Sequence, residues 1–589
     1  MIAHNIIATL GKSASLKIQS GDLSEAEELL NKILCLESNN FHALLLLGSI
    51  LGSMGRPKEA ITPLKKAQKI NSKDLHVLHN LGKALFDTQA YSDSIAVFKE
   101  LLSLGGPNSD VFIDIGTAHL RCGKPELAIE YYDEAILHSP LLSAAWNNKS
   151  AALLELKNLD SAELINTKAL ELDDGNADAW LNRGNIFFAK ELFDEAIKCF
   201  TQSKAIFPGI AKAHIGIANA LTKLGKEDLA LNQYVQTIEQ FPENADAHYN
   251  LGTFYDSIKD YENAIKQYEE ALRINPLLSI AGWNLSLSSH LSSNLQKGWD
   301  FYHHRWELVD YPRKQHQNIP PLRSLAAGTN KSVLVWHEQG LGDSIQFSRF
   351  LPLLAKMGYL VTFDCQKPLI NLLGCLQNIS LTSGLIKPSK FDFQVPLLDL
   401  PKLFGINISN IPTPDQYLTA DEDRSIYWEK LINGERNQLP NIGIACSGNI
   451  NHQNDVNRSI PLSVFLPLST QANLFLLQNH LRASDKPALE SMRINHITAS
   501  IDDFADTAAI VNSMDLIISV DTSIAHLSGA LGKITWLLLP FHNDFRWLSN
   551  GTTSPWYGKM ELFRQKSKGD WSGVIADITS ALSKIAPPA

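Results

Sequence analysis

An apolar run at 516–520 ends in the polar residues Asp521, Thr522 and Ser523, and residues with helical spacing follow. The run is short and rich in β-branched residues, so this stretch predicts a strand, a tight turn and a helix that carries His526. The first N–H groups of a helix have no intrahelical partner and carry partial positive charge. A turn at the end of a parallel strand is therefore suited to binding a phosphate. The alternative is that the turn is an ordinary part of such a fold and that His526 faces solvent or a neighbouring strand.

A second turn of this kind follows the apolar run at 332–336. Gly340 and Gly342 allow the chain to turn tightly and to approach a ligand, and Asp343 is placed to cap the helix that follows. If capping is its only role, Asp343→Ala costs about 0.5–2 kcal/mol of stability and has no special effect on turnover.

Two further polar loops follow predicted strands. The run at 441–446 opens into a loop that begins with Ser447 and reaches Arg458, whose guanidinium fork can bind two phosphate oxygens at once. Alternatively, Arg458 pairs with Asp455 on the surface. A loop at the carboxyl end of another predicted strand, where open α/β sheets bind ligands, contains Phe541, His542, Asp544, Arg546 and Trp547.

The stretches HEQGLGDSIQFSRF and DTSIAHLSGALGK resemble glycosyltransferase family 9, the heptosyltransferase-like enzymes, and the similarity extends over roughly residues 330 to 585. The resemblance implies a GT-B fold, in which two Rossmann-like domains hold the active site between them without a bound metal or other cofactor. It makes Asp343 the general base that takes the proton from the acceptor. One departure is that Glu338 and Gln339 stand where the family has basic residues. The implied contacts to a nucleotide-diphosphate sugar are Gly340, Gly342, Ser447, Arg458, Asp521, Thr522, Ser523, His526 and Asp544.

The composition describes a soluble globular protein, with 44% hydrophobic and 19% charged residues and a net charge of -10. Lys and Arg are outnumbered by Asp and Glu and form no dense run, which argues against nucleic-acid binding. No apolar segment reaches transmembrane length, and the amino terminus lacks the features of a signal peptide. We therefore expect a cytoplasmic protein with reduced, scattered cysteines.

The amino-terminal half repeats with a period of 34 residues, which is typical of tetratricopeptide repeats. About eight repeats keep good register from about Ser15 to His290. The small residues are expected where two helices of a repeat cross closely, and prolines in the same register are expected to end the second helix. One set of small residues comprises Gly48, Gly82, Gly116, Ser150, Gly184, Ala218, Gly252 and Ser286, and a second comprises Ala26, Ala60, Ser94, Ala128, Ala162, Ala196, Ala230 and Ala264.

Asparagines recur two residues before many of the small positions of the first set. A column of side-chain amides offers donors and acceptors at fixed spacing, so it can hold an extended peptide backbone. The pattern is similar to the asparagine ladder of the O-linked N-acetylglucosamine transferases, which also join tetratricopeptide repeats to a glycosyltransferase. The alternative is that asparagine here only bridges or caps helices. The candidate groove residues are Asn80, Asn148, Asn182, Asn250 and Asn284.

The sequence thus predicts an all-α tetratricopeptide superhelix followed by an α/β GT-B fold. The expected divisions are the repeats (1–290), a capping helix and linker (291–330), the acceptor-side half (331–420), an interdomain linker (421–440) and the nucleotide-sugar half (441–589).

The favoured function is that of a hexosyl- or heptosyltransferase-like enzyme, in which the repeats recruit a protein or peptide acceptor. Two alternatives are a scaffold whose α/β half is inactive and a sensor that binds a nucleotide sugar without turnover. The sequence leaves the sugar, the base, the acceptor and the oligomeric state open.

Overall fold

The computed structural model describes residues 2–309, 311, 314–326, 330–432, 439–451, 454–478, 481–492, 494–497 and 501–584. The chain forms two compact units, Met1–Ala247 and His248–Ala589.

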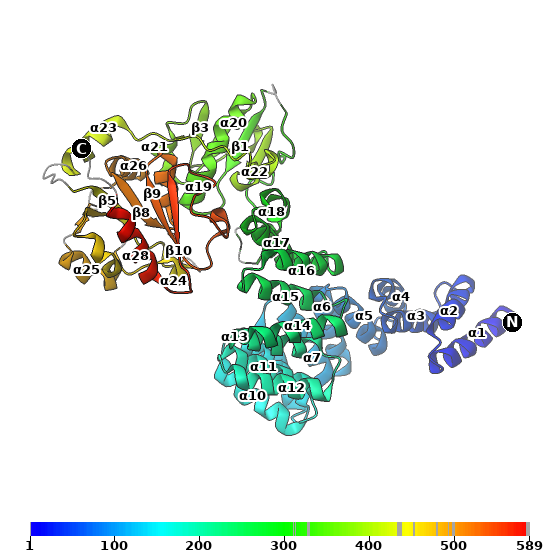
Figure 1. Ribbon diagram of the computed structural model, residues 1–589. Coiled ribbons are helices and arrows are strands. Elements are labelled where there is room, and N and C mark those ends of the chain that lie inside the picture. Colours follow the sequence, from blue (N-terminus) through cyan, green and yellow to red (C-terminus); the bar gives the residue numbers. More distant parts are fainter. Residues whose placement is uncertain are drawn as a thin grey trace. The chain divides into compact units, whose positions relative to one another are not determined.

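The first unit is entirely helical over its described residues, and consecutive helices pack on one another (Figure 1). The predicted helical repeats are therefore confirmed. The helices are α1 (Ile2–Gln19), α2 (Leu23–Leu36), α3 (Phe41–Ser53), α4 (Pro57–Ile70), α5 (Leu75–Asp87), α6 (Tyr91–Gly105), α7 (Ser109–Arg121), α8 (Pro125–His138), α9 (Ser143–Glu155), α10 (Leu159–Leu172), α11 (Ala177–Ala189), α12 (Phe193–Ile206), α13 (Ala211–Lys223), α14 (Glu227–Gln240) and the start of α15 (Ala245–Ser257).

The small residues lie where two helices of a repeat meet, as expected. A Cβ added at Gly82 would overlap the ring of Phe98, and one added at Gly116 would lie 2.6 Å from the ring of Tyr132. The hydroxyl of Ser94, from the second small set, donates to the carbonyl of Gly82 over 2.8 Å. Small residues are therefore required on one helix because a buried aromatic ring from the next helix fills the space beside them.

Prolines in the same register follow the ends of the second helices. Pro140 comes two residues after α8, and Pro208 comes two residues after α12. Because proline has no backbone N–H and cannot continue a helix, these positions separate one repeat from the next.

The second unit starts with the last repeat helices and continues into two sheets. Its helices are the rest of α15, α16 (Tyr261–Ile274), α17 (Ser279–Leu291), α18 (Leu295–Phe301), α19 (Leu341–Phe347), α20 (Leu351–Lys356), α21 (Ile370–Leu373), α22 (Leu400–Leu403), α23 (Glu422–Ile432), α24 (Asp455–Arg458), α25 (Lys486–Ser491), α26 (Phe504–Asn512), α27 (Ser523–Ala530) and α28 (Trp571–Leu582). The 3-10 turns used below are η1 (Tyr302–Glu307), η2 (Ser348–Phe350), η6 (Leu462–Leu468) and η9 (Phe545–Trp547).

Aromatic residues join the last repeat to the α/β region. Trp299 and Tyr302 are buried in the same hydrophobic cluster as Phe347 and Phe545. The ring of His290 lies 4.3 Å from that of Trp299 and 4.8 Å from that of Phe545, centroid to centroid. The last repeat and the α/β region therefore share one core.

A buried ion pair fixes the same junction. Arg305 in η1 is fully buried and donates to both carboxylate oxygens of Glu338, over 2.7 and 3.0 Å. It also pairs with Asp399 at 2.7 Å. Glu338, which departs from the family pattern, thus anchors η1, the segment after α18, to the first sheet.

The first sheet has four parallel strands in the order β3-β2-β1-β4; β1 and β3 are labelled in Figure 1. They are β1 (Ser332–Trp336), β2 (Leu360–Asp364), β3 (Ile379–Thr382) and β4 (Phe393–Pro396). Part of the predicted linker before β1 extends this sheet. Leu322 N–H donates to the carbonyl of Gln394 over 2.8 Å, and Gln394 N–H donates to the carbonyl of Pro320.

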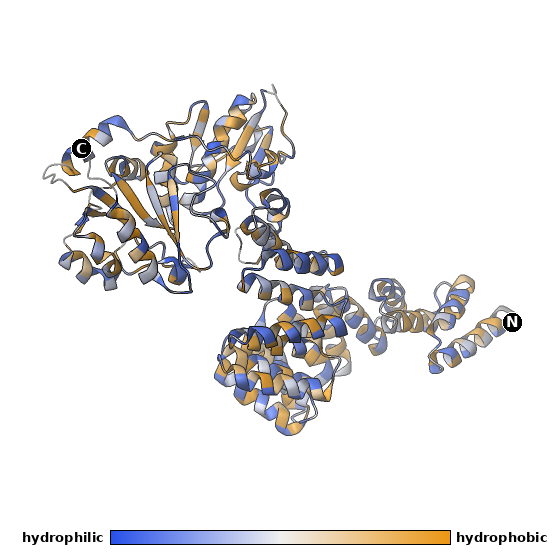
Figure 2. Ribbon diagram, in the orientation of Figure 1, coloured by the Kyte–Doolittle hydropathy of each residue, from blue (hydrophilic) through white to orange (hydrophobic). Residues whose placement is uncertain are grey.

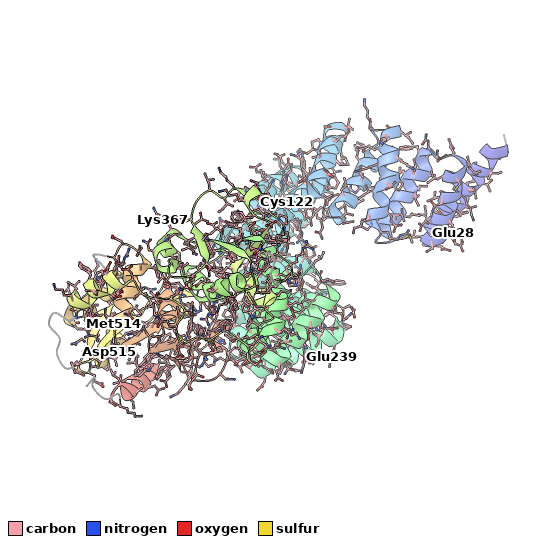
Figure 3. The ribbon with its side chains drawn as sticks, turned by 90° about the horizontal axis from the view of Figure 1, so that it is seen from above. Glu28, Cys122, Glu239, Lys367, Met514 and Asp515 are labelled. Carbon is pink, nitrogen blue, oxygen red and sulfur yellow. The ribbon has the colours of Figure 1, made fainter. Side chains whose placement is uncertain are left out.

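The second sheet has six parallel strands in the order β10-β9-β8-β5-β6-β7. They are β5 (Asn441–Ala445), β6 (Asn473–Leu476), β7 (Asn495–His496), β8 (Leu516–Val520), β9 (Thr535–Leu539) and β10 (Met560–Arg564). Figure 2 shows its central strands in hydrophobic colours, as expected for a sheet covered on both faces. Asp515, labelled in Figure 3 beside Met514, accepts from the backbone N–H of Asn441 over 2.8 Å and so ties the starts of β8 and β5 together. Both sheets are compatible with the α/β prediction.

Candidate functional site

The turn after β8 has the predicted form of strand, turn and helix. Thr522 is the N-cap of α27, with extended backbone angles of φ −141° and ψ 173°. The N–H groups of Ala525 and His526 reach back to its carbonyl, over 3.1 and 3.4 Å. The N–H groups of Ser523 and Ile524 precede the first of these bonds within the helix. They are therefore suited to binding an anion.

Arg458 reaches this turn from another loop. Its NH1 group donates to the carbonyl of Asp521 over 2.8 Å, although 63 residues separate them. The surface pairing weighed as the alternative is weak, because Nε lies 3.9 Å from Asp455 and the closer partner of that carboxylate is Arg482. Among the residues that the structure describes, the buried Nε of Arg458 has no hydrogen-bond acceptor. Gly448 leaves room for the guanidinium, which a Cβ at that position would overlap.

Ser447 is buried and engaged with Gln478. Its backbone N–H donates to the Gln478 side-chain oxygen over 3.0 Å, and its hydroxyl accepts from the Gln478 amide over 2.9 Å. These bonds link the loop after β5 to the residues that follow β6.

His526 points into the protein and not toward solvent, with 5% of its surface exposed. Its Nδ1 lies 3.0 Å from the hydroxyl of Tyr557, and its ring stacks on Trp547 at 5.2 Å. Nε2 lies 3.8 Å from Asp521 Oδ1. Burial and, to a smaller extent, the charge of Arg546 lower the pKa of His526 well below its usual value. The imidazole is therefore neutral at neutral pH.

The first glycine-rich turn lies against α27. A Cβ added at Gly342 would lie 2.8 Å from Cδ2 of His526. This glycine therefore allows the turn to lie close to His526. Asp343 was expected to be the N-cap of the helix, but the N-cap is Gly340. Asp343 is the third helical residue, and its Oδ2 accepts from the backbone N–H of Gly340 over 3.0 Å. The reason is that a carboxylate at this position can reach back to the N-cap amide.

Arg546, which the sequence placed in the predicted ligand loop with Asp544, joins the two sheets at this point. Its guanidinium pairs with Asp343 from the first sheet region and with Asp544 at 2.8 Å. Its Nε donates to the side-chain oxygen of Gln346 over 3.0 Å. Its place in the polar loop after β9 was the sequence signal for a role in binding, whereas its pairing with Asp343 had no signal in the sequence.

Burial controls the proton affinity of the two candidate carboxylates. It raises the pKa of Asp343, and the charge of Arg546 opposes this effect only in part. Burial, and then the neighbouring Asp544, raise the pKa of Asp521 to about 6. Both carboxylates therefore hold a proton more readily than exposed ones do.

The candidate groove asparagines are half-buried on the first helices of their repeats. In the first unit these are Asn80, Asn148 and Asn182, and the amide of Asn182 donates to Asn147 Oδ1 over 2.8 Å. In the second unit they are Asn250 and Asn284. Their role in binding a peptide stays a prediction.

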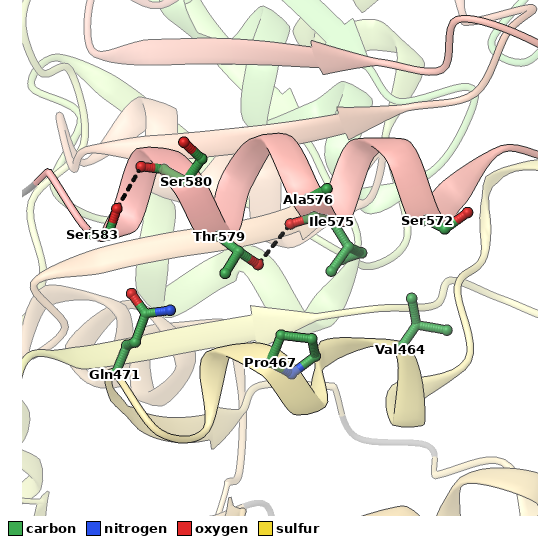
Figure 4. Close-up of a pocket in the computed structure, with 9 residues that line it drawn as sticks. All are labelled: Val464, Pro467, Gln471, Ser572, Ile575, Ala576, Thr579, Ser580 and Ser583. Carbon is green, nitrogen blue, oxygen red and sulfur yellow. Dashed lines mark hydrogen bonds between the residues drawn. The ribbon is translucent and has the colours of Figure 1, made fainter.

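A hollow of about 590 Å³ lies elsewhere, between α28 and η6 (Figure 4). Val464 and Pro467 line one side, and Ile575 and Thr579 line the other. None of the predicted site residues borders it. Over the part of the chain that the structure describes, no group of three or more His, Cys, Asp or Glu side chains is placed to hold a metal ion. In the same residues, no helix is long and apolar enough to cross a membrane.

Family models match several segments of the helical region. The tetratricopeptide repeat model matches residues 177–209 and 245–276, and two related repeat models match 113–177 and 218–257. A model of anaphase-promoting complex subunit 3 matches residues 19–101.

Two relatives differ in how much of this chain and of their own length is matched. Protein FlbA of Caulobacter vibrioides is 22% identical over 563 residues, which cover 89% of this chain and 87% of that protein. The BBSome complex member BBS4 of Bos taurus is 24% identical over 171 residues, which cover 29% of this chain and 32% of that protein. The chain thus spans most of the first relative but only a third of the second.

Solved structures match part of this chain. The crystal structure of MamA is 25% identical, covers 30% of this chain and 95% of that chain, and has a TM-score of 0.28. A tetratricopeptide repeat protein from Parabacteroides merdae is 18% identical, covers 48% of this chain and 99% of that chain, and has a TM-score of 0.33. The family models, the 34-residue register and the paired helices together show that the amino-terminal region is a tetratricopeptide superhelix.

Proposed function

We propose that this chain binds a protein or peptide partner through its tetratricopeptide repeats and transfers a sugar to it from a nucleotide-diphosphate sugar. In this proposal the α/β region is a GT-B glycosyltransferase. The first part is supported by the repeats themselves, because such solenoids expose extended binding surfaces. A relative of the repeats is named as a member of a protein complex, which agrees with this role.

One observation carries the enzymatic part. Arg458 contacts the backbone at the start of the anion-type turn, and the helix that begins with that turn packs on the helix that carries Asp343. Three segments far apart in the sequence thus meet at the carboxyl ends of two parallel sheets, where α/β proteins bind ligands.

The proposed step is a displacement at the anomeric carbon of the donor. The acceptor oxygen forms a bond to that carbon as the bond from the carbon to the diphosphate oxygen breaks. The nucleoside diphosphate leaves with the bonding electron pair, and Asp343 takes the acceptor proton. Arg458 and the N–H groups at the start of α27 would stabilise the charge on the leaving diphosphate.

A thermal-shift panel of the whole protein with UDP, GDP, ADP, CDP and dTDP tests the donor site. A nucleotide at about 100 times its dissociation constant stabilises the protein that binds it by about 2.7 kcal/mol. We expect one nucleotide to raise the melting temperature, and Arg458→Ala to weaken the shift. Arg482→Ala is the matched control, because Arg482 pairs with Asp455 nearby but makes no contact with the turn in the described residues. No shift with any of the nucleotides would count against a donor site.

A second candidate function is a scaffold whose α/β region is inactive or only senses a nucleotide. It is favoured by the pairing of Asp343 with Arg546 and by the burial of His526. A protein that binds a nucleotide but releases no nucleoside diphosphate from any sugar nucleotide, with any peptide acceptor, would match this second function.

The groove asparagines are tested by the combined substitution of Asn148 and Asn182 with Ala. Peptides that bind the whole protein in a fluorescence-polarisation screen should bind this variant more weakly, because each amide can hold a backbone group. Equal affinity would mean that the asparagines only bridge helices.

A further inference from the structure

Arg546 has the properties of a phosphate-binding residue whose donors are already occupied. All three of its nitrogens are engaged by side-chain oxygens, from Asp343, Asp544 and Gln346. Only 8% of its side chain is exposed. Its guanidinium also lies 4.4 Å from the ring centroid of Phe545. A planar fork that binds carboxylates in this way binds phosphates by the same geometry.

Asp343 is occupied as well. One carboxylate oxygen pairs with Arg546, and the other accepts the backbone N–H of Gly340. Burial raises the pKa of Asp343, but both contacts favour its charged form and so oppose that rise. Release of Arg546 would therefore make Asp343 a stronger base. If Asp343 is the base, its contact with Arg546 has to be broken before reaction.

The charge of a diphosphate can break that contact. Trp547, the residue after Arg546, stacks on His526 at 5.2 Å, and Nε2 of His526 lies 3.8 Å from Asp521 Oδ1, in the first residue of the anion-type turn. Arg546 therefore lies close to the turn, and its positive charge also opposes the rise in the pKa of Asp521. A diphosphate carries more negative charge than the single carboxylate with which it would compete.

The loop around Arg546 can stay in place while its side chain moves. Phe545 packs on His290 and Trp299 of the last repeat. Ser549 N–H donates to the carbonyl of Leu291 over 3.1 Å. The backbone is thus held on both sides of Arg546, and only its long side chain has to change partner.

We propose that Arg546 is a diphosphate-binding residue that Asp343 holds in the unliganded protein, and that a nucleoside diphosphate draws Arg546 away and releases Asp343. This inference rests on the proposed glycosyltransferase function and adds an order to it, with donor before acceptor. It makes a prediction of unusual sign: removing the charge of the proposed base should strengthen donor binding.

Isothermal titration of the whole protein tests this, with UDP, GDP, ADP, CDP, dTDP and inorganic pyrophosphate as probes. Asp343→Asn keeps the size of the side chain, so we expect it to bind the nucleotide and pyrophosphate about tenfold more tightly, a factor that corresponds to about 1.4 kcal/mol. Arg546→Gln should bind both about tenfold more weakly. Glu338→Gln is the matched control, because it weakens a buried Arg–carboxylate pair five residues earlier that does not involve the second sheet; its affinity should equal that of the wild type.

The outcomes separate this inference from the function on which it rests. Binding by the wild type with equal or weaker binding by Asp343→Asn overturns the inference alone, because a purely structural ion pair predicts no tightening. Binding by Asp343→Asn but not by the wild type supports it. No binding by either protein overturns both the inference and the donor site. Circular dichroism checks each fold, and Asp343→Ser replaces Asp343→Asn if the latter is unfolded.

Discussion

The repeats and the α/β region place their important contacts at very different distances along the chain. In the repeats, Ser94 bonds to Gly82 over a separation of 12 residues, and Phe98 fills the space beside the same glycine. In the α/β region, Arg546 pairs with Asp343 over 203 residues, and Arg349 in η2 donates to the carbonyl of Trp556 over 207.

This difference explains which features a sequence reveals. A repeat stabilises itself by contacts with itself and its neighbours, so the same residue types return at a fixed period. The α/β site depends on single pairs that occur once, which produce no period. The following substitutions test whether the loss of a long-range contact costs more stability than the loss of a local one.

The largest effect is expected at the junction, where Arg305 is fully buried between Glu338 and Asp399. Arg305→Ala leaves two carboxylates without their partner, and removal of one partner of a buried pair costs about 3–5 kcal/mol. Urea denaturation should show this loss in the unit His248–Ala589, whereas the helical unit Met1–Ala247 should unfold as in the wild type. A loss below about 1 kcal/mol would mean that the junction contributes little stability.

His290 should make the same junction sensitive to acid. Burial lowers its pKa to about 3, whereas the unfolded chain takes up the proton near pH 6.5. The folded state thus binds fewer protons between these values, and the free energy of unfolding falls as the pH drops through this window. From pH 7 to pH 4 the contribution is about 3 kcal/mol.

The variant His290→Gln isolates this contribution, because glutamine does not titrate. As the pH falls from 7 to 4, the free energy of unfolding should decrease more for the wild type than for the variant. A difference that stays constant from pH 7 to pH 4 would show that His290 is protonated as easily in the folded state as in the unfolded one.

The smallest effect is expected within one repeat. Gly82→Ala places a methyl group into the ring of Phe98, and overpacking of this kind costs about 1–3 kcal/mol. Gly52→Ala is the control, because nothing lies within 4 Å of a Cβ at that helical position. Thermal denaturation should show a loss for the first variant and none for the second. Equal stability of the two variants would mean that the two helices of the repeat move apart to admit the methyl group without a loss of stability.

The sequence located most of the elements of the α/β region but not all of their roles. The strands at 332–336 and 516–520 have the predicted bounds, because both are short apolar runs between clear turn signals. β3, β6, β7 and β10 were missed; the alternating or mixed polarity of β3 and β10 resembles that of loops. The cap of α19 was placed on Asp343 because an aspartate before a helix usually caps it, but the chain enters the helix at Gly340.

The sequence by itself determined the repeats, the two sheets and the positions of the polar turns, because periodicity and strand-ending turns are local properties of the chain. Only the tertiary structure decided which polar groups meet. It placed Arg458 on the carbonyl of Asp521 and Arg546 on Asp343, and it enclosed His526 between Gly342 and Trp547. The physical reason is that burial and pairing depend on residues brought together from across the fold, and these set the charge and availability of each candidate group.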